Sequence, residues 1–378
     1  MKRLQELINY GQSYWLDNLT RQKILGGELT DRVEKQGLRG ITSNPAIFNK
    51  AISTSDAYDD QMQHLAGSGK SVGDIYEALV VKDVQDACDI LRSVYDETEG
   101  KDGYVSLEVS PYLAHDTEGT IEEARRLFAA VDRPNGFIKI PGTPAGVPAI
   151  EQMLYEGVNI NITLLFSIDA YEAVARAYIR ALERRAAEGK SPEDVASVAS
   201  FFLSRIDVLV DELLEHRMPP GRPTEFSEMA EALLGKVAIA SARVAYQRFK
   251  KIFGSARWQL LGQKGARVQR PLWASTSTKN PEYNDVRYVD SLIGPDTVNT
   301  LPDHTIDAFA DHGALKANTI EEDVTDAYEV LRTLRDVGID LDYVTTRLVD
   351  EGVQKFIDPF DDLMETISEE MQKLQPQL

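Results

Sequence analysis

The sequence predicts a closed parallel barrel of the (β/α)8 class, and two observations carry this prediction. Short apolar segments typical of buried strands alternate with helical patterns from one end of the chain to the other. No Gly-x-Gly-x-x-Gly motif follows the first strand, which removes the main signal of an open dinucleotide-binding sheet. Eight strands separated by helices favour a TIM barrel, a class in which a chain of 378 residues can form one unit.

The expected elements begin and end at turn residues. The strands are expected at 14–18, 38–43, 104–109, around Lys139, and at 158–164, 195–202, 270–276 and 297–301. The helices are expected at 21–36, 75–95, 120–131, 150–155, between the fifth strand and residue 188, and at 206–216 and 226–252. No repeat or linker divides the chain. We therefore assign residues 1–378 to a single barrel domain, with extra helices between strands and a helical C-terminal extension from about residue 320.

Composition excludes several classes of function. The formal net charge of -20 argues against nucleic-acid partners and anionic membrane surfaces, which are bound by clustered basic residues. The first residues lack the apolar centre of a signal peptide, and no segment approaches the length of a membrane span. The single cysteine, Cys88, fits a reducing compartment. We expect a soluble cytoplasmic protein that would bind an anionic substrate through a few local cations.

The most unusual strand contains a lysine within an apolar run, at residues 136–143. Alternation along a strand places Lys139 on the same face as Phe137. Burial can lower the pKa of a lysine by several units and leave a free amine that attacks carbonyl groups. The alternative is a lysine that extends to water from a half-exposed strand. On this segment alone the second reading is favoured, because single lysines in strands are usually solvent-exposed.

Polar residues recur on one face of the other strands. In the fifth strand, Asn159, Asn161 and Thr163 alternate with apolar residues. An antiparallel sheet with one wet face explains this pattern equally well, but in a barrel the three side chains point into the lumen. Similar residues stand near the carboxyl ends of the other strands, where barrel enzymes hold their active sites. They are Asp17, Thr42, Asn44, Glu108, Ser275, Ser277 and Lys279.

These residue types together favour amine catalysis. The five histidines lie outside the predicted strands and show no metal-binding spacing, so no metal site is expected. An amine that condenses with a ketone forms an iminium, which makes the neighbouring carbon–carbon bond breakable. A carboxylate within hydrogen-bond distance can move the protons, and amides with hydroxyls suit a polyol. We expect no cofactor, because the lysine itself serves as the electron sink.

Five segments resemble the transaldolases, a family of barrel enzymes that form Schiff bases. They occur in the family's order and span about residues 10 to 310: ITSNP at 41–45, SLEVS at 106–110, FIKIP at 137–141, NINITLLFS at 159–167 and WASTSTKN at 273–280. Two positions depart from many relatives. Phe201 stands where they have proline, and Lys279 stands where some have arginine. A lysine keeps the positive charge but cannot make the bidentate contact with phosphate that an arginine makes.

The resemblance implies a role for each matching residue. Lys139 would be the Schiff-base nucleophile. Glu108 would be the acid/base that shares a water with Thr163, and Asp17 would take the hydroxyl proton during carbon–carbon cleavage. Residues that would hold the dihydroxyacetone unit are Thr42, Asn44, Asn161 and Ser200. Residues that would hold the phosphate are Arg205 and Lys279, with assistance from Ser277.

The expected reaction moves dihydroxyacetone from sedoheptulose 7-phosphate or fructose 6-phosphate to glyceraldehyde 3-phosphate or erythrose 4-phosphate, as in the non-oxidative pentose phosphate pathway. One alternative is a fructose 6-phosphate aldolase that releases free dihydroxyacetone. Such enzymes tend to carry tyrosine where this chain has Phe202, which favours transfer. The other alternative is a non-catalytic barrel that binds sugar phosphates, with Lys139 paired to Glu108.

The oligomeric state is left open by the sequence. Apolar stripes at 353–374 could pack on the barrel or against a second subunit, so both a monomer and a homodimer are compatible with them.

Overall fold

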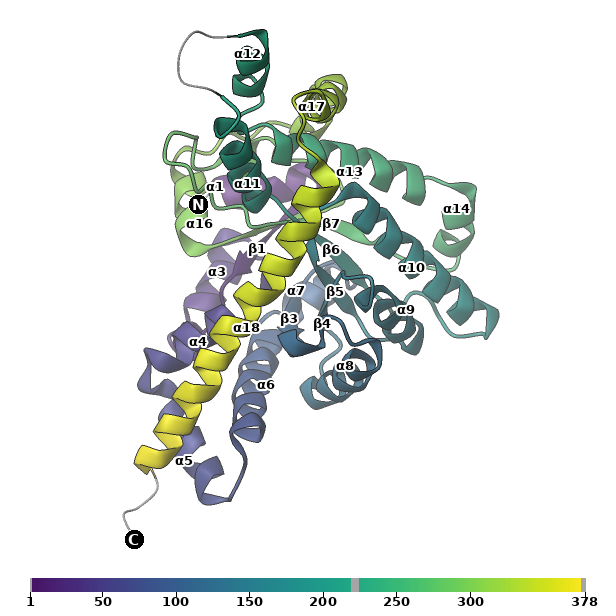
Figure 1. Cartoon of the computed structure of the whole chain (residues 1–378). Helices are drawn as coiled ribbons and strands as arrows, with labels where there is room; N and C mark the ends of the chain where they lie inside the picture. The colour runs from purple at the N-terminus through teal and green to yellow at the C-terminus, as the bar shows by residue number, and fades with distance from the viewer. Residues whose placement is uncertain (1, 219–223, 375–378) are drawn as a thin grey trace.

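The computed structural model describes residues 2–218 and 224–374. Within these residues, eight parallel strands close into a barrel in sequence order, and β8 pairs with β1 (Figure 1). The strands are β1 Gln12–Asp17, β2 Gly40–Thr42, β3 Tyr104–Glu108, β4 Gly136–Pro141, β5 Ile160–Leu165, β6 Ser197–Phe202, β7 Arg270–Ala274 and β8 Thr297–Leu301. The predicted (β/α)8 class is confirmed.

Helices cover the outside of the barrel, and further helices stand between strands and after β8. Those that precede β6 are α1 Lys2–Glu6, α2 Arg21–Leu25, α3 Glu28–Gln36, α4 Pro45–Ser53, α5 Asp59–Gly67, α6 Val72–Ile90, α7 Arg92–Glu97, α8 Thr117–Val131, α9 Gly146–Glu156 and α10 Ile168–Ala187. Those that follow β6 are α11 Ser204–Glu215, α12 Glu225–Glu231, α13 Val237–Phe253, α14 Ala256–Gly262, α15 Arg287–Asp290, α16 Asp303–His312, α17 Val324–Asp336 and α18 Leu341–Leu374. No helix of the described ranges combines the length and apolar character that a membrane span needs.

Three predicted helices are each divided into two. The helix expected at 75–95 becomes α6 and α7, with Leu91 between them. The helix expected at 21–36 is divided into α2 and α3, because Gly27 adopts a left-handed φ of 76° between them. The helix expected at 226–252 is divided into α12 and α13, and Gly235 has a φ of 66° in the connection. Glycine takes these angles without the steric cost that other residues meet. Ser71 caps the start of α6, where its side chain and that of Asp74 form a capping box.

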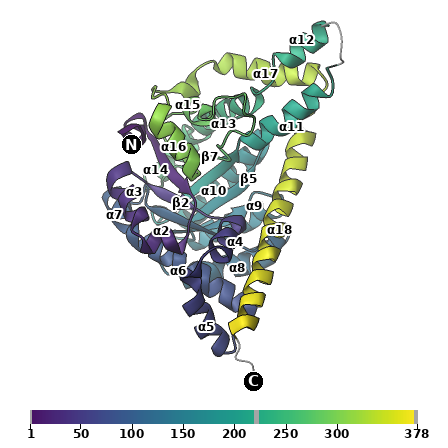
Figure 2. The ribbon, with the colours of Figure 1, turned by 90° about the vertical axis from the view of Figure 1, so that its left-hand side faces the viewer.

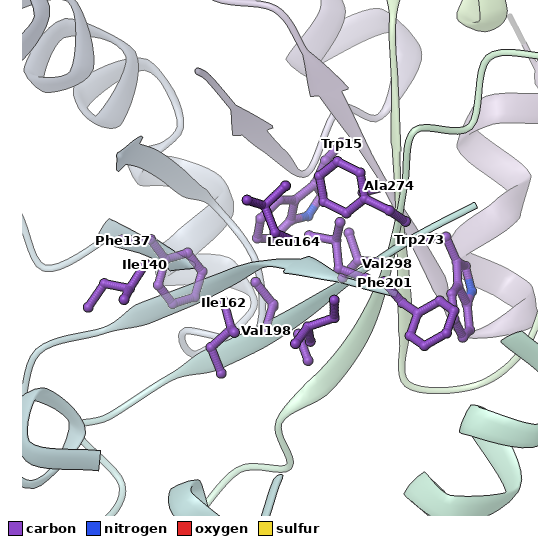
Figure 3. Close-up of a cluster of buried hydrophobic side chains, with 14 of the residues drawn as sticks. Trp15, Phe137, Ile140, Ile162, Leu164, Val198, Phe201, Trp273, Ala274 and Val298 are labelled. Atoms are coloured by element: carbon purple, nitrogen blue, oxygen red, sulfur yellow. The ribbon is translucent and has the colours of Figure 1, made fainter. Parts of the chain in front are cut away.

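The lumen is closed below the site by aromatic side chains from several strands. Trp15 and Phe137 lie with ring centroids 6.1 Å apart, and Phe137 stacks on Tyr104 at 4.2 Å. Figure 3 shows Trp15 and Phe137 within the apolar cluster that the strands enclose. Gly40 on β2 makes room for this layer, because a Cβ there would lie 2.4 Å from the indole of Trp15. The aromatic layer keeps the carboxyl-end pocket separate from the base of the barrel.

The base of the lumen holds a buried ion pair. Arg270 on β7 donates to Asp102 at 2.9 Å, and it also donates to Ser13 Oγ at 2.6 Å. Asp102 accepts further hydrogen bonds from Ser13 and Trp15. A buried pair stays stable only when such additional hydrogen bonds compensate for lost hydration. The pair therefore ties β1 and β7 to the loop before β3.

The C-terminal helix α18 crosses the barrel on the side of the site. In Figure 1 it runs diagonally across the strands, and in Figure 2 it runs along one side of the molecule. It contacts α4, α6, α11 and the end of β5. Gly352 marks a close approach, since a Cβ there would lie 2.9 Å from Leu164 and 3.6 Å from Arg205. The apolar stripe of the tail thus packs on its own barrel.

Candidate active site

Lys139 lies inside the barrel, next to Glu108. Its ammonium donates to Glu108 Oε2 at 2.9 Å and to the Ser43 carbonyl at 3.1 Å. The two side chains are only 5% and 4% exposed. Register explains the pairing, because Glu108 on β3 stands directly opposite Lys139 on β4. The reading of a lysine that extends to water is therefore wrong, and the amine stands in a buried polar centre.

Burial raises the pKa of the Glu108 carboxyl, and the attraction of Lys139 offsets only part of that effect. The Oε1 atom of Glu108 and the Oγ1 atom of Thr163 have no hydrogen-bond partner in the described part of the chain. Buried polar atoms of this kind are usually satisfied, so both have capacity left for a reactant or a water. A carboxyl with a raised pKa is suited to donate and accept protons near neutral pH.

Asp17 stands across the pocket from this pair. Thr42 Oγ1 donates to Asp17 Oδ1 at 2.7 Å, and the Thr42 and Thr300 hydroxyls lie 2.7 Å apart. The carboxylate and the lysine line one cavity of about 230 Å³ at the carboxyl ends of the strands. Asn44 also lines it, while its Oδ1 caps α4 by accepting from the Ile47 amide. Two carboxylates and one amine thus share the lumen.

A chain of amide and hydroxyl groups forms the floor next to the lysine. Asn161, opposite Lys139 in the register, accepts from Ser200 at 2.7 Å and donates to Ser106 Oγ at 3.0 Å. Asn161 lies beneath the cavity, whereas Ser200 lines it. Asn159 lies lower still, where it donates to the Pro134 carbonyl and accepts from the Ala196 amide. Asn159 therefore belongs to the base of the barrel and not to the site.

Two cations line the same cavity. Arg205 is in the first turn of α11, directly after β6, and Lys279 is in the loop after β7. Burial lowers the pKa of both groups, and Arg205 lowers that of Lys279 further. Neither forms an ion pair within residues 2–218 and 224–374, and Arg205 Nη1 is buried without a hydrogen-bond partner. Two adjacent cations beside a helix N-terminus favour a bound anion.

The sequence prediction missed several residues that line the cavity, among them His304, Phe356 and Thr300. His304, in α16, lies with Nε2 2.8 Å from the predicted residue Ser277. Phe356 of α18 has its ring centroid 5.4 Å from Lys139 Nζ and 6.0 Å from Arg205. Thr300 stands at the end of β8. A usable signal existed for His304 and Thr300, since both stand at or just after a strand's carboxyl end. No local signal identifies Phe356.

The cavity gathers most of the predicted residues and offers no metal site. Nine of them line it, namely Asp17, Thr42, Asn44, Lys139, Thr163, Ser200, Arg205, Ser277 and Lys279. Glu108 and Asn161 adjoin it through Lys139 and Ser200. In the ranges that the structure describes, histidine, cysteine and carboxylate side chains form no group that could hold a metal ion. The arrangement can perform amine chemistry on a small anionic polyol.

Comparison with known proteins agrees with this geometry. Residues 14–367 match the family described as Transaldolase/Fructose-6-phosphate aldolase. The chain is 52% identical over 375 residues to the "Transaldolase" of Trichodesmium erythraeum, with 99% of this chain and 98% of that protein covered. It is 53% identical over 376 residues to "Transaldolase 2" of Nostoc punctiforme, with 99% and 98% covered. It is 47% identical over 368 residues to the "Transaldolase" of Frankia alni, with 97% of each covered.

The fold, the buried lysine and these matches over nearly the full length lead to one conclusion. The chain belongs to the transaldolase/fructose-6-phosphate aldolase family.

Proposed function

We propose that this enzyme is a transaldolase that carries a dihydroxyacetone unit on Lys139. The donor is sedoheptulose 7-phosphate or fructose 6-phosphate, and the acceptor is glyceraldehyde 3-phosphate or erythrose 4-phosphate. The observation that carries the proposal is the contact of 2.9 Å between Lys139 Nζ and Glu108, in a lumen that also holds Asp17. The arrangement provides an amine that contacts one carboxyl group, that of Glu108, and shares its cavity with a second, that of Asp17.

The first half of the reaction forms the Schiff base. The Lys139 amine gives a proton to Glu108, and its nitrogen attacks C2 of the donor ketone. The C2 oxygen takes two protons through Glu108 and leaves as water, so that a C=N⁺ bond replaces C=O. We assign the proton shuttle to Glu108 Oε1 and Thr163 Oγ1, because both atoms have hydrogen-bonding capacity left. The positive iminium then draws electrons from the C3–C4 bond.

The second half breaks and remakes a carbon–carbon bond. The Asp17 carboxylate takes the proton of the C4 hydroxyl, the C3–C4 bond breaks, and the aldose phosphate leaves. The remaining three-carbon enamine attacks the aldehyde carbon of the acceptor, and Asp17 returns its proton. Hydrolysis of the new iminium frees the product. Thr42 holds Asp17 in place through its 2.7 Å hydrogen bond.

The phosphate of either sugar would bind at Arg205 and Lys279. An anion between them relieves their mutual repulsion and satisfies the buried Nη1 of Arg205. Transfer is favoured over release of free dihydroxyacetone because Phe202 presents a ring, without a hydroxyl, to the cavity. Phe356 from α18 adds a second ring. Neither ring carries a polar group that could position a water to protonate the enamine.

A coupled assay with and without acceptor tests the proposal. Fructose 6-phosphate with erythrose 4-phosphate should give steady formation of glyceraldehyde 3-phosphate, and omission of erythrose 4-phosphate should nearly abolish it. Equal turnover without acceptor, with free dihydroxyacetone as product, would identify an aldolase instead. Absence of turnover under both conditions would identify a non-catalytic barrel. The isosteric variant Asp17→Asn serves as a matched control, since it should lose cleavage and keep Schiff-base formation.

The proposal extends to partners and location. Sugar phosphates are the expected partners, and the net charge of -20 disfavours nucleic acid and anionic membranes. Cys88 is a buried free thiol, which fits the reducing cytoplasm. Light scattering distinguishes a monomer from a homodimer.

A further inference from the structure

A second cavity lies behind Glu108, on the outer side of the barrel wall. It has a volume of about 440 Å³ and lies between α6, α8, α18 and the end of β3. We call it the rear cavity. Glu108 lines this cavity and not the one that contains Lys139. The polar residues around it include Tyr76, Glu77, Ser110, Glu123 and Arg126.

Polar groups connect Glu108 to the surface through the rear cavity. Tyr76 lines the rear cavity together with Glu108 and Glu123. Burial and the charges of these two carboxylates raise the pKa of its phenol. Glu123 accepts from the Ser110 amide at 2.9 Å, and Arg126 donates to both Glu123 and Glu77. The Arg126 side chain is 51% exposed. The rear cavity is thus lined by polar groups that include both the buried Glu108 and the half-exposed Arg126.

Helix α18 contributes a phenylalanine to each of the two cavities. Phe356 lies over the front cavity, whereas Phe360, one helical turn later, lines the rear cavity and packs edge-on against Tyr76 at 5.3 Å. Phe360 also lies 6.2 Å from Tyr112. The rear cavity has room for several waters, and its polar lining can satisfy them.

A second exit would serve the chemistry. A bound sugar phosphate occupies the front cavity, with its phosphate at Arg205 and Lys279. Formation of the iminium releases one water at Glu108, beneath the substrate, and hydrolysis takes one water up at the same place. The front is blocked by the substrate at both moments. A water that could not leave would return to C2 and reverse the step.

We propose that the rear cavity is the route by which water and protons pass between Glu108 and solvent while sugar occupies the front cavity. The proposal rests on the proposed function. For each iminium formed, the carbinolamine loses its C2 hydroxyl with one added proton as water, which leaves past Tyr76 and Glu123. For each iminium hydrolysed, one water enters by the same path, and its oxygen becomes the ketone oxygen of the product.

Gly73 offers a way to close the route. It lines the rear cavity at the start of α6, and a Cβ there would meet no atom within 4 Å. Gly73→Leu therefore places a side chain at the mouth without a collision, and leucine favours the helix over glycine. Gly67→Leu is the matched control, since Gly67 ends α5, is equally free of neighbours and does not line the cavity. Tyr76→Phe is a second variant, which keeps the ring contact and removes the hydroxyl.

The readout is oxygen exchange. Fructose 6-phosphate labelled with ¹⁸O at C2 is incubated with enzyme in ordinary water, and mass spectrometry follows label loss, corrected for the rate without enzyme. Gly73→Leu should lose label at least about threefold more slowly than wild type and Gly67→Leu, with an unchanged donor KM. Tyr76→Phe should also lose label more slowly than wild type. Wild-type exchange in both Gly73→Leu and Tyr76→Phe would overturn the proposal.

Borohydride trapping distinguishes a failure of the proposed function from a failure of the rear route alone. If wild type gives neither exchange nor an adduct on Lys139, the proposed function fails. If the adduct forms and the plugged variants exchange oxygen like wild type, the function stands and only the rear route fails.

Discussion

Replacing Glu108 by glutamine should slow the reaction strongly while leaving donor binding nearly unchanged. The amide has the shape of the carboxyl and can still accept the hydrogen bond that Lys139 makes at 2.9 Å. It cannot carry a proton. Loss of a positioned acid/base typically costs 10²–10⁴ in rate, or about 3–5 kcal/mol of transition-state stabilisation. Glu108 does not line the front cavity, so the donor KM should stay within about threefold of wild type.

The measurement is steady-state transfer from fructose 6-phosphate to erythrose 4-phosphate over a range of pH. Burial raises the pKa of Glu108, so the protonated form persists to higher pH than for an exposed glutamate. The first step needs the ionised carboxylate to take the Lys139 proton, so wild-type activity should rise with pH as Glu108 ionises. That rise should be absent in Glu108→Gln. The reasoning fails if the variant keeps its kcat and instead raises the donor KM tenfold or more, at about 1.4 kcal/mol per factor of ten.

Three further predictions concern the phosphate site and the fold. Arg205→Gln combined with Lys279→Gln should raise the KM for fructose 6-phosphate by about 10–100-fold, because charge-assisted hydrogen bonds contribute about 1.5–3 kcal/mol. The double variant should leave the KM for unphosphorylated fructose unchanged. Burial raises the pKa of Asp207 from 3.8 to about 6, so the folded state binds more protons than the unfolded state between these values. As pH rises from 4 to 7, wild type should therefore lose up to about 3 kcal/mol of unfolding free energy relative to Asp207→Asn. The same difference in unfolding free energy between the two proteins at both pH values, measured by urea unfolding, would contradict this. Gly40→Ala should lower stability by about 1–3 kcal/mol, since its Cβ would lie 2.4 Å from Trp15, and a thermal melt unchanged from wild type would show that the indole can move.

Strand identity was predictable because each strand is a short apolar run with turn residues at both ends. β8 matches the expected range 297–301, and β4 surrounds Lys139 as expected. The start of β1 was missed by two residues, since Gln12 is polar and joins the barrel through its pairing with Thr297. Such pairing depends on a strand almost three hundred residues away, which no local pattern contains.

The site was predictable where a residue's position on its strand fixes its direction. Glu108 and Lys139 face each other because alternation puts both in the lumen and register puts them side by side. Phe356 could not be found this way. The apolar stripe of α18 indicates that one face of the helix is covered, but it does not indicate whether the partner is the barrel or another subunit. The split of the helix expected at 226–252 likewise depends on the backbone angle at Gly235.

The most direct test of the account is to trap the intermediate on Lys139. Wild-type enzyme is mixed with fructose 6-phosphate, reduced with borohydride and digested, and the modified peptide is identified by mass spectrometry. The account predicts a reduced three-carbon dihydroxyacetone adduct on Lys139, and no adduct in Lys139→Arg, which keeps the charge beside Glu108. An adduct on any other lysine, or transfer activity retained by Lys139→Arg, would contradict the central claim.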